Sequence, residues 1–151
     1  MDLEHRIAQQ FAANIEHASQ AATQLAGPIA RASREIVESL LQGGKILSCG
    51  NGGSASLSQH FMAKMIHRFD RERPGLPAVA LSSSSSTLTS VADDLDCAHI
   101  FSTQIAALGH PGDILLAISA TGTSANVVHA VDAARERPMS VIALNGGEGG
   151  R

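Results

Sequence analysis

The fold of this chain is decided by the stretch Lys45-Ile46-Leu47-Ser48-Cys49-Gly50-Asn51-Gly52-Gly53-Ser54. Residues 45–49 form a short apolar run, which is typical of a β-strand buried on both faces. The glycines that follow predict a tight turn, and residues 54–69 have a helical pattern. A buried strand that passes through a glycine turn into a helix indicates an α/β domain.

The same alternation continues along the chain. We expect further strands at 77–81, 113–118 and 139–144, and further helices at 87–92, 99–108 and 124–135. Continuous apolar strands that alternate with helices form a parallel sheet covered on both faces. Since crossovers between parallel strands are right-handed, the expected fold is α/β, a doubly wound parallel sheet.

The N-terminal 42 residues predict two helices. Apolar residues recur at helical spacing in the first of them, at Leu3, Ile7, Phe11, Ile15 and Ala18. Gly27-Pro28 is expected to end this helix and to start a second one, which Gly43-Gly44 ends. The apolar stripe of the first helix packs either on a partner subunit or on the chain's own domain.

Composition excludes several classes of protein. The 151 residues suffice for one domain, and 44% hydrophobic against 17% charged residues excludes a disordered chain. A net charge of −3 and four Phe without Trp or Tyr disfavour nucleic acid as a partner. There is no apolar run long enough for a membrane helix and no signal peptide, and two cysteines fit a reducing compartment, so we expect a cytoplasmic protein.

Small polar residues follow all four predicted strands, at 50–54, 82–86, 119–124 and 145–147. Ligands of such sheets bind beyond the carboxyl ends of the strands. Two of these loops, 50–54 and 119–124, run directly into helices, whose N-termini, together with glycines and hydroxyls, form a phosphate cradle that needs no lysine. Ser124 has the alternative role of a helix N-cap.

Residues 50–55 also match the dinucleotide pattern G-x-G-x-x-A. A nicotinamide-binding domain needs an acidic residue at the end of its second strand, where this chain has Leu81 followed by serines. This disfavours a dinucleotide.

Titratable side chains lie close to the predicted cradle. His60 and Lys64 are four residues apart and share a helix face, but Lys64 would repel a metal ion. Asp93 and Asp94 either cap a helix or accept hydrogen bonds from sugar hydroxyls. Cys49 is expected to be a small buried residue without thiol chemistry.

Several segments carry a family resemblance that covers nearly the whole chain: 46–54, 59–61, 68–78, 112–119 and 121–127. On these segments the chain resembles the sugar isomerase (SIS) family, and within it the bacterial phosphoheptose isomerases and the DnaA initiator-associating proteins. The resemblance implies a flavodoxin-like SIS domain at 44–151, apparently without its last strand and helix. It also implies an N-terminal helical oligomerisation arm at 1–43, and a homotetramer built by that arm.

The resemblance further implies a phosphosugar site, which in the isomerases holds sedoheptulose 7-phosphate. The residues at its positions are Asn51, Gly52, Gly53, Ser54, Asp93, Asp94, Ser119, Ala120, Thr121 and Ser124. Lys64 stands where the isomerases have the glutamate that acts as base, and His60 stands at a family zinc position. With Lys64 present we expect no zinc and no other cofactor.

Two functions follow. The first is a non-catalytic phosphosugar-binding protein that regulates replication initiation by binding DnaA, which the segment 65–70 favours. The second is a phosphoheptose isomerase that makes glycero-manno-heptose 7-phosphate for lipopolysaccharide synthesis. The isomerisation passes through an enediol and needs a base of suitable protonation. The residue type at position 64 therefore distinguishes the two functions.

Overall fold

The computed structural model describes residues 2–146 and 149. It divides into two compact units, Met1–Glu35 and Ile36–Arg151. The first unit consists of the larger part of helix α1 (Leu3–Leu41), and the second contains the end of that helix and the whole sheet. No helix in this described part of the chain has the length and apolar character needed to cross a membrane.

Helix α1 continues through Pro28, so the predicted break at Gly27-Pro28 is wrong. A proline inside a helix removes one backbone hydrogen bond and crowds the carbonyl four residues earlier. The neighbouring residues are mostly Ala, Gln, Leu and Arg, which favour the helix and offset the loss of one bond. The predicted end at Gly43-Gly44 is confirmed, since Gly43 adopts a φ of 83° directly after the last turn.

The sheet contains four parallel strands in the order β2-β1-β3-β4. The strands are β1 (Ile46–Gly50), β2 (Ala78–Ala80), β3 (Ile114–Ser119) and β4 (Ser140–Asn145). The helices between them are α2 (Gly53–Ile66), α3 (Ser85–Asp94), α4 (Ser102–Leu108) and α5 (Ala125–Glu136). Every residue of β1 and β3 is buried, as their continuous apolar runs predict, and the α/β class is confirmed.

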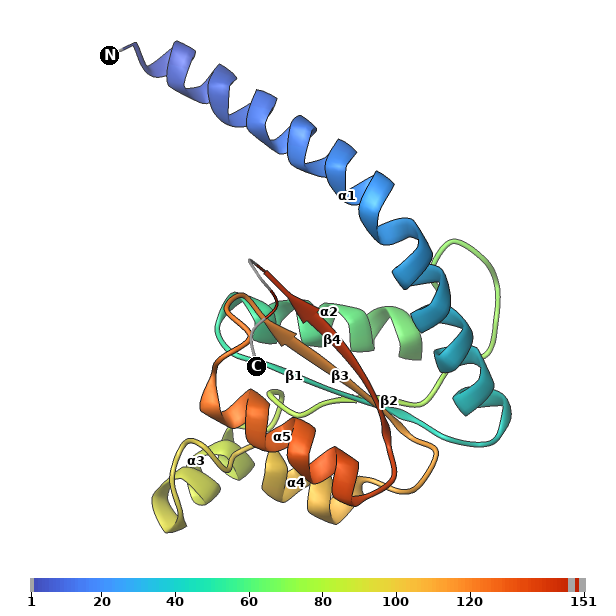
Figure 1. Cartoon of the computed structure of the whole chain (residues 1–151). Coiled ribbons are helices and arrows are strands. Elements are labelled where there is room, and N and C mark those ends of the chain that lie inside the picture. Colours follow the sequence, from blue (N-terminus) through green and yellow to red (C-terminus); the bar gives the residue numbers. More distant parts are fainter. Residues whose placement is uncertain (1, 147–148, 150–151) are drawn as a thin grey trace. The chain divides into compact units, whose positions relative to one another are not determined.

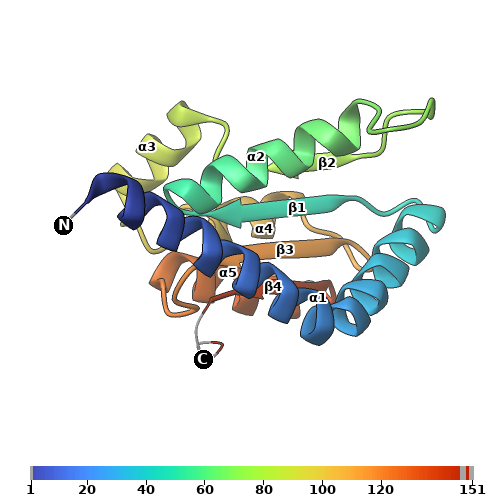
Figure 2. The same cartoon turned by 90° about the horizontal axis from the view of Figure 1, so that it is seen from above.

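Helices cover both faces of the sheet (Figures 1 and 2). On one face, Phe61, Met62 and Met65 of α2 pack on the sheet cluster of Ile46, Ala78, Ile114, Leu116 and Ile118. On the other face, residues of α4 and α5 pack with the opposite side chains of β1 and β3. Cys49 belongs to this second cluster, where burial raises the pKa of its thiol to about 12. The thiol is therefore neutral at physiological pH.

The order of the strands creates one position where the chain changes direction across the sheet. Strand β1 leads to β2 on one side, while the neighbouring strand β3 leads to β4 on the other side. Their helices α2 and α5 accordingly cover opposite faces (Figure 1). Such a switch point leaves a crevice at the carboxyl ends of the two strands, where ligands of open α/β sheets bind.

Helix α2 ends at Ile66, three residues before the predicted end. The guanidinium of Arg73 donates hydrogen bonds to the carbonyl oxygens of Lys64 (2.6 Å) and Met65 (3.0 Å). These carbonyls belong to the last turn of the helix, where they have no partner within the helix itself, and that of Met65 also accepts a hydrogen bond from the backbone N–H of Leu76 (3.0 Å). Arg73 thus fixes the end of α2 and the loop after it, which contains Phe69.

The buried carboxylate of Asp113 lies at the other end of the strands, where β1 and β3 begin. It accepts hydrogen bonds from the backbone N–H groups of Lys45 (2.9 Å) and His110 (2.8 Å) and from the Lys45 ammonium (2.5 Å). Burial alone would raise the pKa of Asp113, but these hydrogen bonds and the charge of Lys45 lower it below its ordinary value. The carboxylate therefore joins the start of β1 to the start of β3.

Candidate functional site

A small pocket of about 130 Å³ lies at the switch point between β1 and β3. It is lined by Asn51, Ser54, Ile118, Ser119, Ala120, Thr121 and Ser124. Apart from Ile118 of β3, these residues come from the two loops that the sequence predicts as one phosphate cradle, and the structure brings them together. Gly52 and Gly53 lie between Asn51 and Ser54 in the first loop and are exposed.

The helices α2 and α5 both begin at this pocket, and neither has a side-chain cap. Gly52 occupies the N-cap position of α2 with φ 51° and ψ −120°, a conformation that favours glycine. Ser124 occupies the N-cap position of α5 without a capping hydrogen bond, whereas Ser84 caps α3 by accepting from the backbone N–H of Thr87. The alternative prediction of Ser124 as the N-cap residue is therefore confirmed for its position in the chain, but its side chain makes no capping hydrogen bond.

Hydroxyl groups converge in the pocket. The buried Ser119 Oγ accepts a hydrogen bond from the backbone N–H of Gly122 (3.0 Å) and lies 3.5 Å from Ser124 Oγ. These two hydroxyls form a long hydrogen bond in which either can donate, so one of the two rotatable hydrogens is free for a ligand. Since helix N-termini carry a partial positive charge, the arrangement suits an anion the size of a phosphate group.

The loop residue Asn51 has a partner that the sequence did not indicate. Its side-chain amide exchanges two hydrogen bonds with that of Asn126 in the first turn of α5, each 2.8 Å long. The two asparagines are 75 residues apart in the chain. Sequence spacing offers no signal for such a pair.

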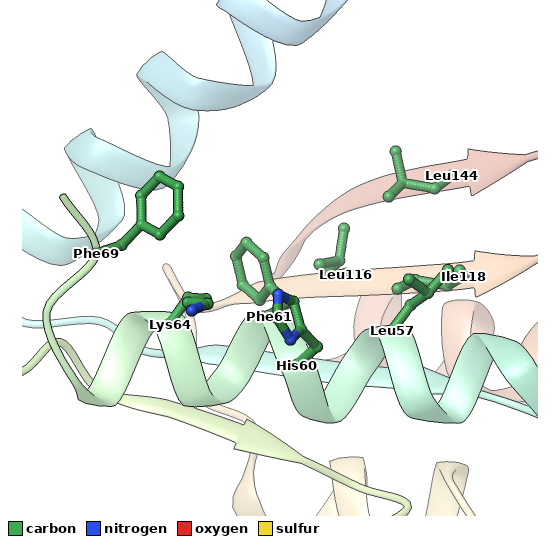
Figure 3. Close-up of a pocket in the computed structure, with 8 residues that line it drawn as sticks. All are labelled: Leu57, His60, Phe61, Lys64, Phe69, Leu116, Ile118 and Leu144. Atoms are coloured by element: carbon green, nitrogen blue, oxygen red, sulfur yellow. The ribbon is translucent and has the colours of Figure 1, made fainter.

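A second, larger pocket of about 370 Å³ adjoins the cradle, and Ile118 lines both. Figure 3 shows the residues of its wall, which are Leu57, His60, Phe61, Lys64, Phe69, Leu116, Ile118 and Leu144. His60 and Lys64 lie one turn apart on α2, as their spacing predicts, and the Lys64 ammonium lies 5.5 Å from the centre of the Phe69 ring. The polar side chains in this wall are those of His60 and Lys64.

The residues of this pocket do not fit a zinc ion. His60 is the one side chain in its wall that commonly ligates zinc, and the cationic Lys64 beside it would repel the metal. Among residues 2–146 and 149 no three His, Cys, Asp or Glu side chains form a group that could hold a metal.

Asp93 and Asp94 are the last two residues of α3 and are exposed. They are not among the residues that line the cradle, so the structure does not bring them into this pocket. The serine run at 82–86 follows β2 but serves the local fold, because Ser83 Oγ donates to the carbonyl of Ala80 and Ser84 caps α3.

Comparison with known proteins agrees with this fold. The family model described as SIS domain matches residues 9–146, so the chain belongs to the SIS domain family. Within that family it belongs with the phosphoheptose isomerases, which the following relatives and structures show.

Curated relatives with this name match the whole chain. The phosphoheptose isomerase of Aromatoleum aromaticum is 55% identical over 151 residues, which are 100% of this chain and 76% of the relative. That of Azoarcus sp. is 52% identical over 151 residues, 100% of this chain and 77% of the relative. The relatives are thus longer than the sequence described.

Solved structures give the same result. A phosphoheptose isomerase from Neisseria gonorrhoeae matches with a TM-score of 0.93 at 45% identity, over 99% of this chain and 78% of the other. One from Francisella tularensis matches with a TM-score of 0.96 at 42% identity, over the same shares of the two chains. The predicted resemblance to the SIS family is confirmed.

Proposed function

We propose that the chain binds a heptose phosphate, the substrate class that its relatives' name implies, and that the phosphate group occupies the cradle between β1 and β3. The observation that carries this proposal is the convergence of two uncapped helix N-termini and two neighbouring serine hydroxyls in one small pocket. The adjoining larger pocket would then receive the carbon chain of the sugar. Lys64 at its wall adds a positive charge that favours an anionic ligand.

The reaction belonging to this site is the aldose–ketose isomerisation of a heptose phosphate. The names of the relatives favour this hypothesis over that of a regulator that binds DnaA. The reaction moves a proton between neighbouring carbons and needs a group that accepts a carbon-bound proton. A lysine is ordinarily charged at neutral pH and has no free electron pair, so Lys64 is a poor base. We therefore propose strong substrate binding and slow turnover.

The proposal includes a homo-oligomer built through the N-terminal helix. Its support is the row of exposed apolar side chains on α1, which has no partner within the first unit. Leu3, Phe11 and Ile15 are each about two-thirds exposed, at 68%, 68% and 70%. Such a row is typical of a helix that packs on another copy of the chain.

Titration calorimetry with sedoheptulose 7-phosphate tests the binding proposal. We expect saturable binding by the unmodified chain and a loss of about tenfold in Ser119→Ala, since a hydrogen bond to a charged group contributes about 1.5 kcal/mol or more. Ser90→Ala is the matched control, because Ser90 is an exposed serine of α3 outside the cradle. Equal affinities in all three proteins would contradict the proposed site.

A further inference from the structure

The paired side-chain amides of Asn51 and Asn126 join the two loops of the cradle. Each asparagine donates from Nδ2 to the Oδ1 of the other, at 2.8 Å in both directions. A reciprocal pair of this kind uses one donor and one acceptor of each amide and holds both side chains in a defined orientation. We call these two residues the amide pair.

The amide pair lies where helices α2 and α5 begin. Asn51 directly precedes Gly52, the N-cap residue of α2, and Asn126 is the second residue of α5. The hydrogen-bonded register of β1 and β3 ends at the pair of Gly50 and Ile118. Beyond it, no backbone hydrogen bond joins loop 51–54 to loop 119–124 in the described residues. The amide pair is therefore a direct link between the starts of the two helices.

The geometry of an anion site depends on that link. An anion held by two helix N-termini needs the N–H groups of both to point at one place, and an error of about 1 Å removes much of the benefit. Gly52 lies two residues beyond the last residue of β1 that pairs with β3, and its conformation favours glycine, a residue with little intrinsic backbone preference. Fixing Asn51 through Asn126 fixes the residue before Gly52.

We propose that Asn126 is a positioning residue of the anion site, and that Asn51 acts through its bond to Asn126 rather than as an independent contact of the ligand. This inference rests on the proposed function, because it concerns the same cradle. It assigns a role to Asn126, which lies outside the wall of the pocket. It also replaces the predicted role of Asn51 as a direct ligand contact.

A double-mutant cycle tests the inference, with inorganic phosphate as the probe and sedoheptulose 7-phosphate as a second ligand. Asn51→Ala, Asn126→Ala and the double variant are compared with the unmodified chain by titration calorimetry. We expect each single variant to bind phosphate about three- to tenfold more weakly, since each breaks the same hydrogen-bonded pair. The double variant should bind phosphate no more weakly than the weaker-binding of the two single variants, because either single substitution already breaks the pair.

Controls separate positioning from general damage to the fold. Asn14→Ala removes an exposed asparagine amide from α1 and should bind phosphate like the unmodified chain. The unfolding free energy of every variant is measured by urea titration. A role that is only structural would lower this free energy without the non-additive change in phosphate affinity.

The outcomes also distinguish this inference from the proposed function. If the unmodified chain binds neither phosphate nor the sugar phosphate, both fail. If it binds them and Asn126→Ala binds equally well, the inference alone fails. A loss in Asn51→Ala that adds to that of Asn126→Ala overturns it too, because Asn51 would then contact the ligand independently.

Discussion

Lys64 is the residue on which the chemistry of this chain depends. It lies on the wall of the pocket beside the cradle, where the family resemblance implies a carboxylate base. General bases contribute roughly 10²–10⁴-fold to such reactions. We therefore expect this chain to isomerise sedoheptulose 7-phosphate at least about 100-fold more slowly than the relative from Neisseria gonorrhoeae, measured by a direct assay of heptose phosphate products.

Binding measured on the same sample serves as the control, because it shows that slow turnover does not come from an unfolded chain. Lys64→Ala should weaken substrate binding, because it removes the positive charge of the pocket wall, but should leave the low rate at saturating substrate unchanged. A rate close to that of the relative, abolished in Lys64→Ala, would show that the lysine is a working base.

Asp113 determines part of the pH dependence of stability. Its pKa lies below the ordinary value because Lys45 and two backbone N–H groups stabilise the charged form against the effect of burial. Because the pKa is lowered on folding, the carboxylate stabilises the fold at pH values above its pKa in the unfolded chain, which is near 3.9. This contribution disappears as the pH falls through the pKa of the folded state. We expect Asp113→Asn to lower the unfolding free energy by about 2 kcal/mol at pH 7.

Urea unfolding between pH 7 and pH 3 measures this effect, and the difference between the two proteins should shrink toward the acid end. Asp132→Asn is the control, since Asp132 is largely exposed and its nearest Arg135 nitrogen is 3.9 Å away. A constant difference at all pH values would contradict the role of the Asp113 charge.

At the scale of elements, the start of α2 depends on the backbone of Gly52. A Cβ at Gly52 or at Gly53 would meet no atom within 4 Å, but Gly52 alone of the two has a positive φ, 51°. Gly52→Ala should therefore lower the unfolding free energy by about 1–3 kcal/mol through backbone strain. Gly53→Ala, the matched control inside the helix, should change it little or raise it slightly. Equal effects of the two substitutions in urea unfolding would be evidence against this explanation.

The elements show what the sequence could and could not predict. All four strands were predicted from apolar runs such as 113–118. The reason for such a run, burial on both faces, holds for β1 and β3, whereas most residues of the apolar edge strand β4 are exposed. The continuity of α1 through Pro28 was not predicted from the sequence. Proline usually breaks a helix, but here the good helix formers around it offset that effect. The end of α2 depends on Arg73, whose carbonyl partners lie six to nine residues earlier in the chain.

The sequence predicted part of the candidate site and missed another part. The loops 51–54 and 119–124 were predicted to meet because the carboxyl ends of parallel strands share one edge. Asn126 was missed because nothing in its local sequence indicates a partner 75 residues away. Asp93 and Asp94 were placed in the site by resemblance, but in the structure they lie exposed at the end of α3.

At the scale of the whole molecule, we expect the chain to form a homotetramer through α1. Sedimentation velocity should show one species of about four chains. In a Phe11→Glu/Ile15→Glu variant that species should dissociate, since both side chains are largely exposed apolar groups of the stripe. Gln10→Glu, which adds a charge at an exposed polar position of the same helix, should leave the assembly intact. An unmodified chain that sediments as a single monomeric species would contradict the prediction.

We propose that the switch point between β1 and β3 holds the phosphate of a sugar phosphate, and a crystal structure of the chain with sedoheptulose 7-phosphate is the direct test of this site. We predict that the phosphate lies between loops 51–54 and 119–124, within hydrogen-bond distance of Ser119 or Ser124 Oγ and of backbone N–H groups at the starts of α2 and α5. The carbon chain should extend toward His60 and Lys64. A phosphate bound elsewhere, with this pocket empty at saturating ligand, would contradict the proposed phosphate site.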